Sequence, residues 1–155
     1  MSPPIPTAHN PLASIPSVLA IRDLRRRLRR RLGKNSVSDE DLIGILQLDP
    51  LAALRGLRCA AAPIFGDQPA AWSIRSLVQV LGPALSRRLI DTPTLGVAGT
   101  KPLRRLWLHS IATACAARDL AQQSGLMPPD EAYLLGLLHD LHLWLRLVGQ
   151  HRYGR

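Results

Sequence analysis

Two histidines and one aspartate in the C-terminal third of the chain are the residues best suited to chemistry. His109 lies in the segment Leu-Trp-Leu-His-Ser, and His139 and Asp140 are neighbours in the segment Leu-Leu-His-Asp-Leu. Imidazole nitrogens and a carboxylate oxygen suit a divalent metal ion. These residue types predict a metal site if the fold brings the three side chains together. The alternative interpretation is that each side chain supports the fold through a hydrogen bond of its own.

Two long helices are expected to position these side chains. The first is predicted from about residue 102 to residue 123. The second follows Pro128-Pro129-Asp130, a strong helix-start signal, and is predicted to run without a break to about residue 148. Leucines between residues 134 and 145 cover every side of this second helix, which predicts a central, buried helix. A His-Asp pair inside such a helix needs partners, because burial of an unpaired polar group costs free energy.

The rest of the chain also favours helix. Leu and Ala dominate, β-branched residues are few, and the alternation typical of strands is absent. Further helices are predicted over residues 17–32, 38–46, 49 to near 63, 72–82 and 83–89, with a loop over 91–100. Residues 1–14 form a Pro-rich leader, residues 15–150 the domain and residues 151–155 a tail. We therefore expect an all-α fold, a compact bundle of about seven helices.

Four segments of the sequence together resemble one family. They are residues 49–53 with the Phe-Gly pair at 65–66, residues 74–82, residues 106–110 and residues 130–140. The last segment reads Asp-Glu-Ala-Tyr-Leu-Leu-Gly-Leu-Leu-His-Asp and is the most specific. Over residues 15–148 the chain is similar to the HDOD domain. This is an HD-related output domain of bacterial signalling proteins, within the HD superfamily of metal-dependent phosphohydrolases.

The resemblance implies an HD-like helical bundle and a non-enzymatic role in signal transduction. The chain would be a regulatory module that binds a protein partner or an upstream sensor and needs no cofactor. The alternative that the family implies is a divalent-metal-dependent phosphohydrolase. In it His109, His139 and Asp140 bind the metal, and another chain or segment completes the site. HD enzymes use a further aspartate downstream, whereas no acidic residue follows Asp140 here. His142 stands where the family has Gly, and it either replaces a lost ligand or lies at the edge of the core.

The helices that close the family's domain have no counterpart at the end of this sequence. This predicts a truncated or decayed copy with exposed apolar surface on its last helix, which a partner or a second copy of the chain would cover. The residues expected in that surface are Leu141, Trp144, Leu145 and Val148. Trp72, Trp107 and Trp144 are otherwise interpreted as packing residues of the core or its boundary.

Positive charge provides a third functional hypothesis. The chain has 20 Lys and Arg against 11 Asp and Glu, a net charge of +9. Arginines gather on one face of the helix predicted over residues 17–32, opposite its leucines; they are Arg22, Arg25, Arg26, Arg29 and Arg30. Such a face can bind nucleic-acid phosphates, anionic lipid or an acidic partner. No aromatic residue for base stacking lies nearby, which argues against recognition of single strands.

Several function classes find no support in the sequence. It contains no Gly-rich phosphate loop, no Gly-x-Ser-x-Gly motif and no Cys-x-x-Cys pair. Cys59 and Cys115 lie among Ala and Leu, as small buried hydrophobic residues do, which favours a reducing compartment. The first residues lack the features of a signal peptide, and charged residues interrupt the most apolar stretch, residues 132–148. We therefore expect a cytoplasmic protein without a transmembrane segment.

Overall fold

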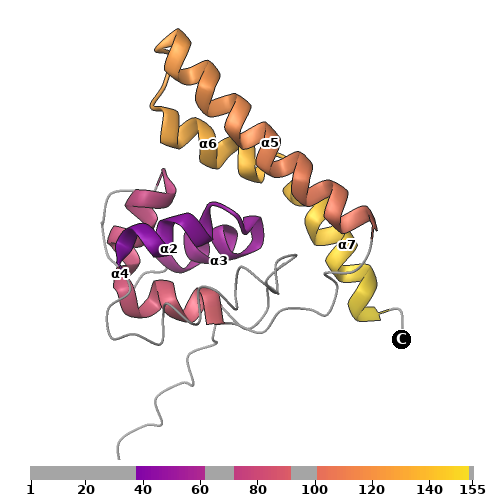
Figure 1. The fold of residues 1–155 in the computed structure, drawn as a ribbon. Helices are drawn as coiled ribbons and strands as arrows, with labels where there is room; N and C mark the ends of the chain where they lie inside the picture. Colours follow the sequence, from indigo (N-terminus) through magenta and orange to yellow (C-terminus); the bar gives the residue numbers. More distant parts are fainter. Residues whose placement is uncertain (1–37, 62–71, 92–100, 154–155) are drawn as a thin grey trace, which may run out of the picture.

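The computed structural model describes residues 38–61, 72–91 and 101–153, which are helical and contain no strand (Figure 1). In chain order the helices are α2 (Asp39–Leu46), α3 (Pro50–Ala60), α4 (Ile74–Asp91), α5 (Lys101–Ser124), α6 (Pro129–Leu138) and α7 (Leu141–Tyr153). The all-α prediction is thus confirmed for the described residues. The helix expected over residues 17–32 lies outside them.

Local capping explains where the first two of these helices begin. Ser38 precedes α2, and its hydroxyl accepts a hydrogen bond from the Asp41 N–H, while the Asp41 carboxylate accepts one from the Ser38 N–H. Asp49 precedes α3, and its carboxylate accepts from the Ala52 N–H at 2.9 Å. Both arrangements satisfy N–H groups that the helix itself leaves without a partner. Both starts match the sequence prediction.

Helix α4 contains a kink where the sequence predicts two short helices. Gly82 has φ 70° and ψ 169°, a conformation that L side chains rarely adopt. Pro83 follows and begins the second half of α4, where its missing N–H is not needed. The Gly-Pro pair therefore bends the helix at the place that the sequence indicates.

The main core joins the two groups of helices seen in Figure 1. Leucine, isoleucine and alanine side chains of α2 and α3 pack against α4, α5 and α6; among them Leu42, Leu46 and Leu137 are fully buried. Two aromatic side chains also tie α5 and α6 to the α2–α3 connection. The Trp107 indole N–H donates to the Leu48 carbonyl at 2.8 Å, and the Tyr133 hydroxyl donates to the Gln47 carbonyl at 3.0 Å. These bonds satisfy polar groups that would otherwise be buried alone.

The helix predicted over residues 129–148 is broken, contrary to expectation. The chain turns at His139 and Asp140, which separate α6 from α7. The turn lets α6 lie along α5 while α7 packs against its N-terminal part (Figure 1). The Asp140 carbonyl accepts from the N–H groups of Leu143 and Trp144, so the new helix starts there. The predicted burial on every side is also wrong, because Leu135 is 62% exposed.

The burial predicted for Cys59, Cys115 and Trp72 is confirmed for only one of the three. Cys59 is buried, and burial raises the pKa of its thiol, whereas Cys115 is half-buried. Trp72 is 65% exposed, so its interpretation as a packing residue is wrong. It lies two residues before the start of α4. Among the helices described, none is long and apolar enough to span a membrane.

Candidate functional site

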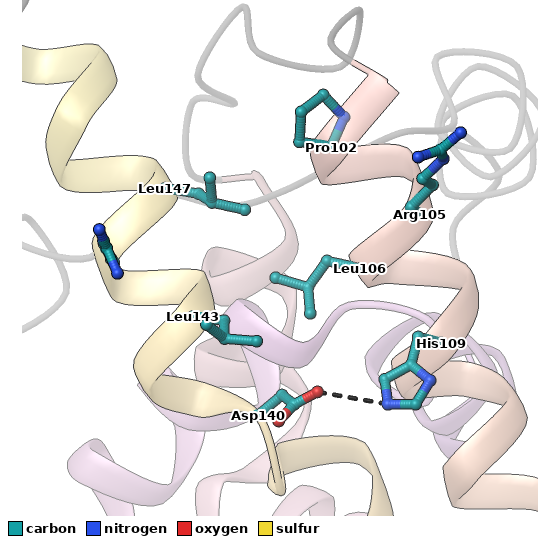
Figure 2. A pocket seen from close by; sticks show the side chains of 8 residues that line it. Pro102, Arg105, Leu106, His109, Asp140, Leu143 and Leu147 are labelled. Carbon is teal, nitrogen blue, oxygen red and sulfur yellow. Dashed lines mark ion pairs between the residues drawn. The ribbon is translucent and has the colours of Figure 1, made fainter.

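The structure brings His109, His139 and Asp140 together, as the sequence predicts. His109 comes from the middle of α5, and the other two residues form the turn between α6 and α7. The two Nε2 atoms lie 3.1 Å apart. The Asp140 Oδ2 atom lies 3.3 Å from the His109 Nε2 and 3.1 Å from the His139 Nε2. Figure 2 shows the Asp140 carboxylate and the His109 ring pointing toward one another across two helices. We call these three residues the polar triad.

A backbone carbonyl sets the orientation of His139. Its Nδ1 atom lies 2.7 Å from the Gly136 carbonyl oxygen. That oxygen can only accept a hydrogen bond, so Nδ1 carries a proton. In the neutral ring the lone pair is then on Nε2, the atom that faces His109 and Asp140. A histidine that donates through one ring nitrogen to a carbonyl while the other faces the site is arranged as metal-ligating histidines usually are.

The polar triad concentrates potential metal-ligand atoms in a small volume. One potential ligand atom from each residue lies within 4.8 Å of the other two. The bond to Gly136 leaves the His139 Nε2 as an acceptor beside the Asp140 carboxylate, and these acceptors repel one another unless a proton on the His109 Nε2 or a cation lies between them. The donor set of two histidines and one carboxylate fits a divalent metal, with further positions left for water or other ligands. The side chains of His109, His139 and Asp140 are 58%, 32% and 20% exposed, so solvent reaches the site.

A glycine on α6 permits the close approach that positions the triad. A Cβ atom at Gly136 would lie 2.8 Å from the Ala114 Cα and 2.9 Å from the Thr113 carbonyl oxygen, both in the backbone of α5. No real Cβ contact is that short, so α6 can cross α5 here only at a glycine. Gly136 had no predicted role of its own, although a glycine inside a helical pattern is a known sign of close packing.

Trp144 is a fully buried anchor for α7 and corrects the predicted apolar surface. Its side chain packs with Leu51, Leu103 and Leu106, and its indole N–H donates to the Ser110 hydroxyl at 3.0 Å. The predicted exposure of Trp144 is therefore wrong, because the turn at residues 139–140 folds α7 back onto α5.

The other residues of that predicted surface differ from one another. Leu141 is only half-buried and packs against the cluster around Trp144. Leu145 is exposed, as expected. The side chain of Val148 lies outside the described residues.

An open groove runs between α5 and α7 and has His109 and Asp140 of the triad at one end. Its volume is about 490 Å³. The lining residues are Pro102, Arg105, Leu106, His109, Asp140, Leu143, Arg146 and Leu147. Figure 2 shows Leu106 on one side facing Leu143 and Leu147 on the other, with His109 and Asp140 beyond them. Neither Arg105 nor Arg146 was predicted to lie at a functional site.

Two other predicted sites have different outcomes. Arg22, Arg25, Arg26, Arg29 and Arg30 lie outside the described residues, so their phosphate-binding role stays a prediction. His142 is exposed, and within the described ranges the cluster of potential metal ligands consists of the triad without it. The position of His142 on the outer side of α7 favours the boundary interpretation over the replacement ligand.

Comparison with known proteins gives the family. The chain matches the HDOD domain over residues 18–147, most of its length, and it belongs to this family. A solved structure similar to it is that of the MmoQ response regulator from Methylococcus capsulatus strain Bath, with 25% sequence identity and a TM-score of 0.69. The match covers 84% of this chain and 53% of MmoQ, so the chain spans about half the length of that protein. No curated protein matches the chain.

Proposed function

We propose that the chain is a regulatory module of a signalling system that binds a protein partner and catalyses no reaction. The observation that carries this proposal is the position of His109 and Asp140 at the end of an open groove lined mainly by leucine and arginine. Such a lining suits the docking of a protein segment, because apolar side chains and cations provide affinity without any reacting group. Membership of the HDOD family and the likeness to a response regulator support the same role.

The chemistry of the triad supports regulation better than hydrolysis. Within the described residues, the cluster of potential ligands offers a single carboxylate, Asp140, beside two histidines. The HD enzymes that the family resembles use a further aspartate, and the described residues place no second carboxylate in this cluster. In this proposal His109 and Asp140 connect α5 to the start of α7, so they help to hold the groove in shape.

A measurement of phosphodiesterase activity tests this proposal. Wild-type protein would be assayed on bis-p-nitrophenyl phosphate with Mg²⁺, Mn²⁺ or Zn²⁺, beside His139→Ala and His142→Ala. We expect no activity above the His139→Ala background. The His142 variant is the matched control, because it removes an exposed imidazole three residues along the chain. Activity that wild type and His142→Ala share, and that His139→Ala lacks, would overturn the proposal and make the chain a phosphohydrolase.

A second candidate function is binding of a divalent metal by the triad. The specific observation that favours it is the His139 ring, which donates through Nδ1 to Gly136 and directs Nε2 toward the other two ligands. His109, His139 and Asp140 would hold the ion, which would neutralise the acceptor atoms gathered there. A bound metal is compatible with a regulatory role, because it would join α5 to the α6–α7 turn.

Thermal unfolding separates metal binding from activity. A ligand that binds only the folded state raises the melting temperature. We expect added Zn²⁺ or Mn²⁺ to stabilise wild type and His142→Ala but not His139→Ala. Equal shifts in all three proteins would mean that the metal binds elsewhere, and this candidate function would be abandoned.

A further inference from the structure

The groove between α5 and α7 is built from one helical stripe of each helix. On α5 the lining residues are Pro102, Arg105, Leu106 and His109, spaced at i, i+3, i+4 and i+7. From the start of α7 they are Asp140, Leu143, Arg146 and Leu147. Residues at these spacings share one face of a helix, the face that packs against a neighbouring helix. The groove thus resembles a surface formed by two helices on which a third helix could pack.

The floor of the groove is apolar and only partly covered by the chain. Leu106 is nearly buried, whereas Leu143 and Leu147 are half-buried and face it across the opening (Figure 2). Apolar surface of this kind gains free energy when a partner removes it from water. A volume of about 490 Å³ accommodates a few aliphatic side chains. Amphipathic helices insert side chains of this kind when they bind in a groove.

Positive charge flanks this apolar floor on both sides. Arg105 lies on α5 and Arg146 on α7, and both side chains are exposed. Lys101 adds a further exposed cation at the same end of α5. The carboxylate of Asp140 is already paired with two histidines. No other acidic residue lies in α7 or in α5 before Asp119, so the cations of the groove face no competing carboxylate on these helices.

We propose that this groove binds an acidic amphipathic helix of the protein partner, with its apolar stripe on the leucines and its carboxylates on Arg105 and Arg146. The inference rests on the regulatory function proposed above and names the chemistry of the partner. Charge argues against an occupant from this chain or a second copy, because the net charge is +9 and residues 22–34 are rich in arginine. The leucine floor argues against nucleic acid, since phosphates are bound by rows of cations rather than by apolar side chains.

Designed peptides test both features of the groove. The probe is a fluorescein-labelled peptide of about 16 residues, long enough to form a helix, with a leucine stripe flanked on both sides by glutamate. One control peptide replaces the glutamates by lysine, and a second replaces the leucines by serine. Binding to the full chain is measured by fluorescence anisotropy. We expect only the first peptide to bind, and we expect added salt to weaken its binding because salt screens the charges.

Charge reversal in the protein locates the binding site. The double variant Arg105→Glu, Arg146→Glu should weaken binding by about tenfold or more, because each attraction becomes a repulsion. The matched control is Arg104→Glu, which makes the same change at an exposed neighbour on α5 that does not line the groove. It should change affinity by about twofold at most. Circular dichroism verifies that every variant is folded.

Several outcomes would overturn this inference. They are equal loss of affinity in Arg104→Glu and the double variant, binding of the lysine peptide, and no binding up to about 1 mM. If wild type and Arg104→Glu bind a duplex DNA probe and the double variant does not, the ligand of the groove is a phosphate backbone and the inference is wrong.

The proposed function fails separately from this inference. If a displayed peptide library yields binders that the groove variants leave unaffected, the groove inference is wrong and partner binding survives. If the library yields none and the phosphodiesterase assay is positive, the regulatory function itself is wrong.

Discussion

Helix α5 packs against α6 and α7 in two different ways. Its contact with α6 is so close that backbone nearly touches backbone, because Gly136 has no side chain to separate it from Ala114. Its contact with α7 depends on one large side chain, Trp144, and beside this side chain the two helices diverge around the groove. Close packing of the first kind leaves no room for a ligand. The second kind leaves an apolar surface that a partner can cover.

The polar triad lies where one kind of packing changes to the other. His139 and Asp140 end α6 and begin α7, and His109 faces them from α5. The rigid α5–α6 crossing fixes the position of His139 through the Gly136 carbonyl. The triad therefore joins the α5–α6 crossing to the start of α7 and to the groove.

The largest expected effect is removal of the anchor of α7. Trp144→Ala deletes a fully buried indole and leaves the Ser110 hydroxyl without its donor. We expect a loss of about 3–5 kcal/mol in the free energy of unfolding. Denaturant unfolding measures it, with Trp72→Ala as the control. Trp72 is 65% exposed, so its replacement should cost about 0.5 kcal/mol or less. A small effect of Trp144→Ala would mean that α7 contributes little to the fold.

The next effect tests the close crossing of α5 and α6. Gly136→Ala places a Cβ against two backbone atoms of α5, which cannot move away as a flexible side chain would. We expect a loss of about 1–3 kcal/mol. Gly44→Ala on α2 is the matched control, because a Cβ there meets nothing within 4 Å. Alanine favours the helix, so this control should gain about 0.5–1 kcal/mol. A change of the same sign in the free energy of unfolding of both variants would contradict the close contact of α5 and α6 at Gly136.

The smallest effect concerns the hydrogen bond between α6 and the α2–α3 connection. Tyr133→Phe removes the hydrogen bond to the Gln47 carbonyl, which should cost about 1 kcal/mol at neutral pH. Burial raises the pKa of Tyr133 to about 12, above the value of 10.0 for a free tyrosine. The wild-type phenol therefore ionises more readily in the unfolded state. The stability of the wild-type protein therefore falls as the pH rises from 10 toward 12. Tyr133→Phe has no phenol at this position and lacks this pH dependence.

Urea denaturation of both proteins measures this difference across the pH range. The stability gap between wild type and Tyr133→Phe should shrink above pH 10, because the other titrating groups are common to both. A gap that stays constant would show that solvent reaches the phenol in the folded protein.

Local signals in the sequence determined much of the helix pattern. Ser38 and Asp49 predicted two helix starts, and Gly82 with Pro83 predicted the kink of α4, because caps and breakers act through neighbouring backbone groups. The residue types and motif around His109, His139 and Asp140 predicted the ligand cluster and the family. Such a motif can be recognised in the sequence because it depends on residue types at fixed positions of two helices that pack together.

Tertiary structure alone decided what the last helices do. Leucines on every side predicted one buried helix, but packing of two segments on α5 favours a turn at His139 and Asp140. That turn buried Trp144, exposed Leu135, and placed Arg105 and Arg146 on the two sides of one groove. These outcomes depend on contacts between residues more than 30 positions apart, as the Trp144–Ser110 bond shows with its separation of 34. A hydrophobic pattern specifies that a side chain is apolar, but only the assembled fold specifies which neighbour covers it.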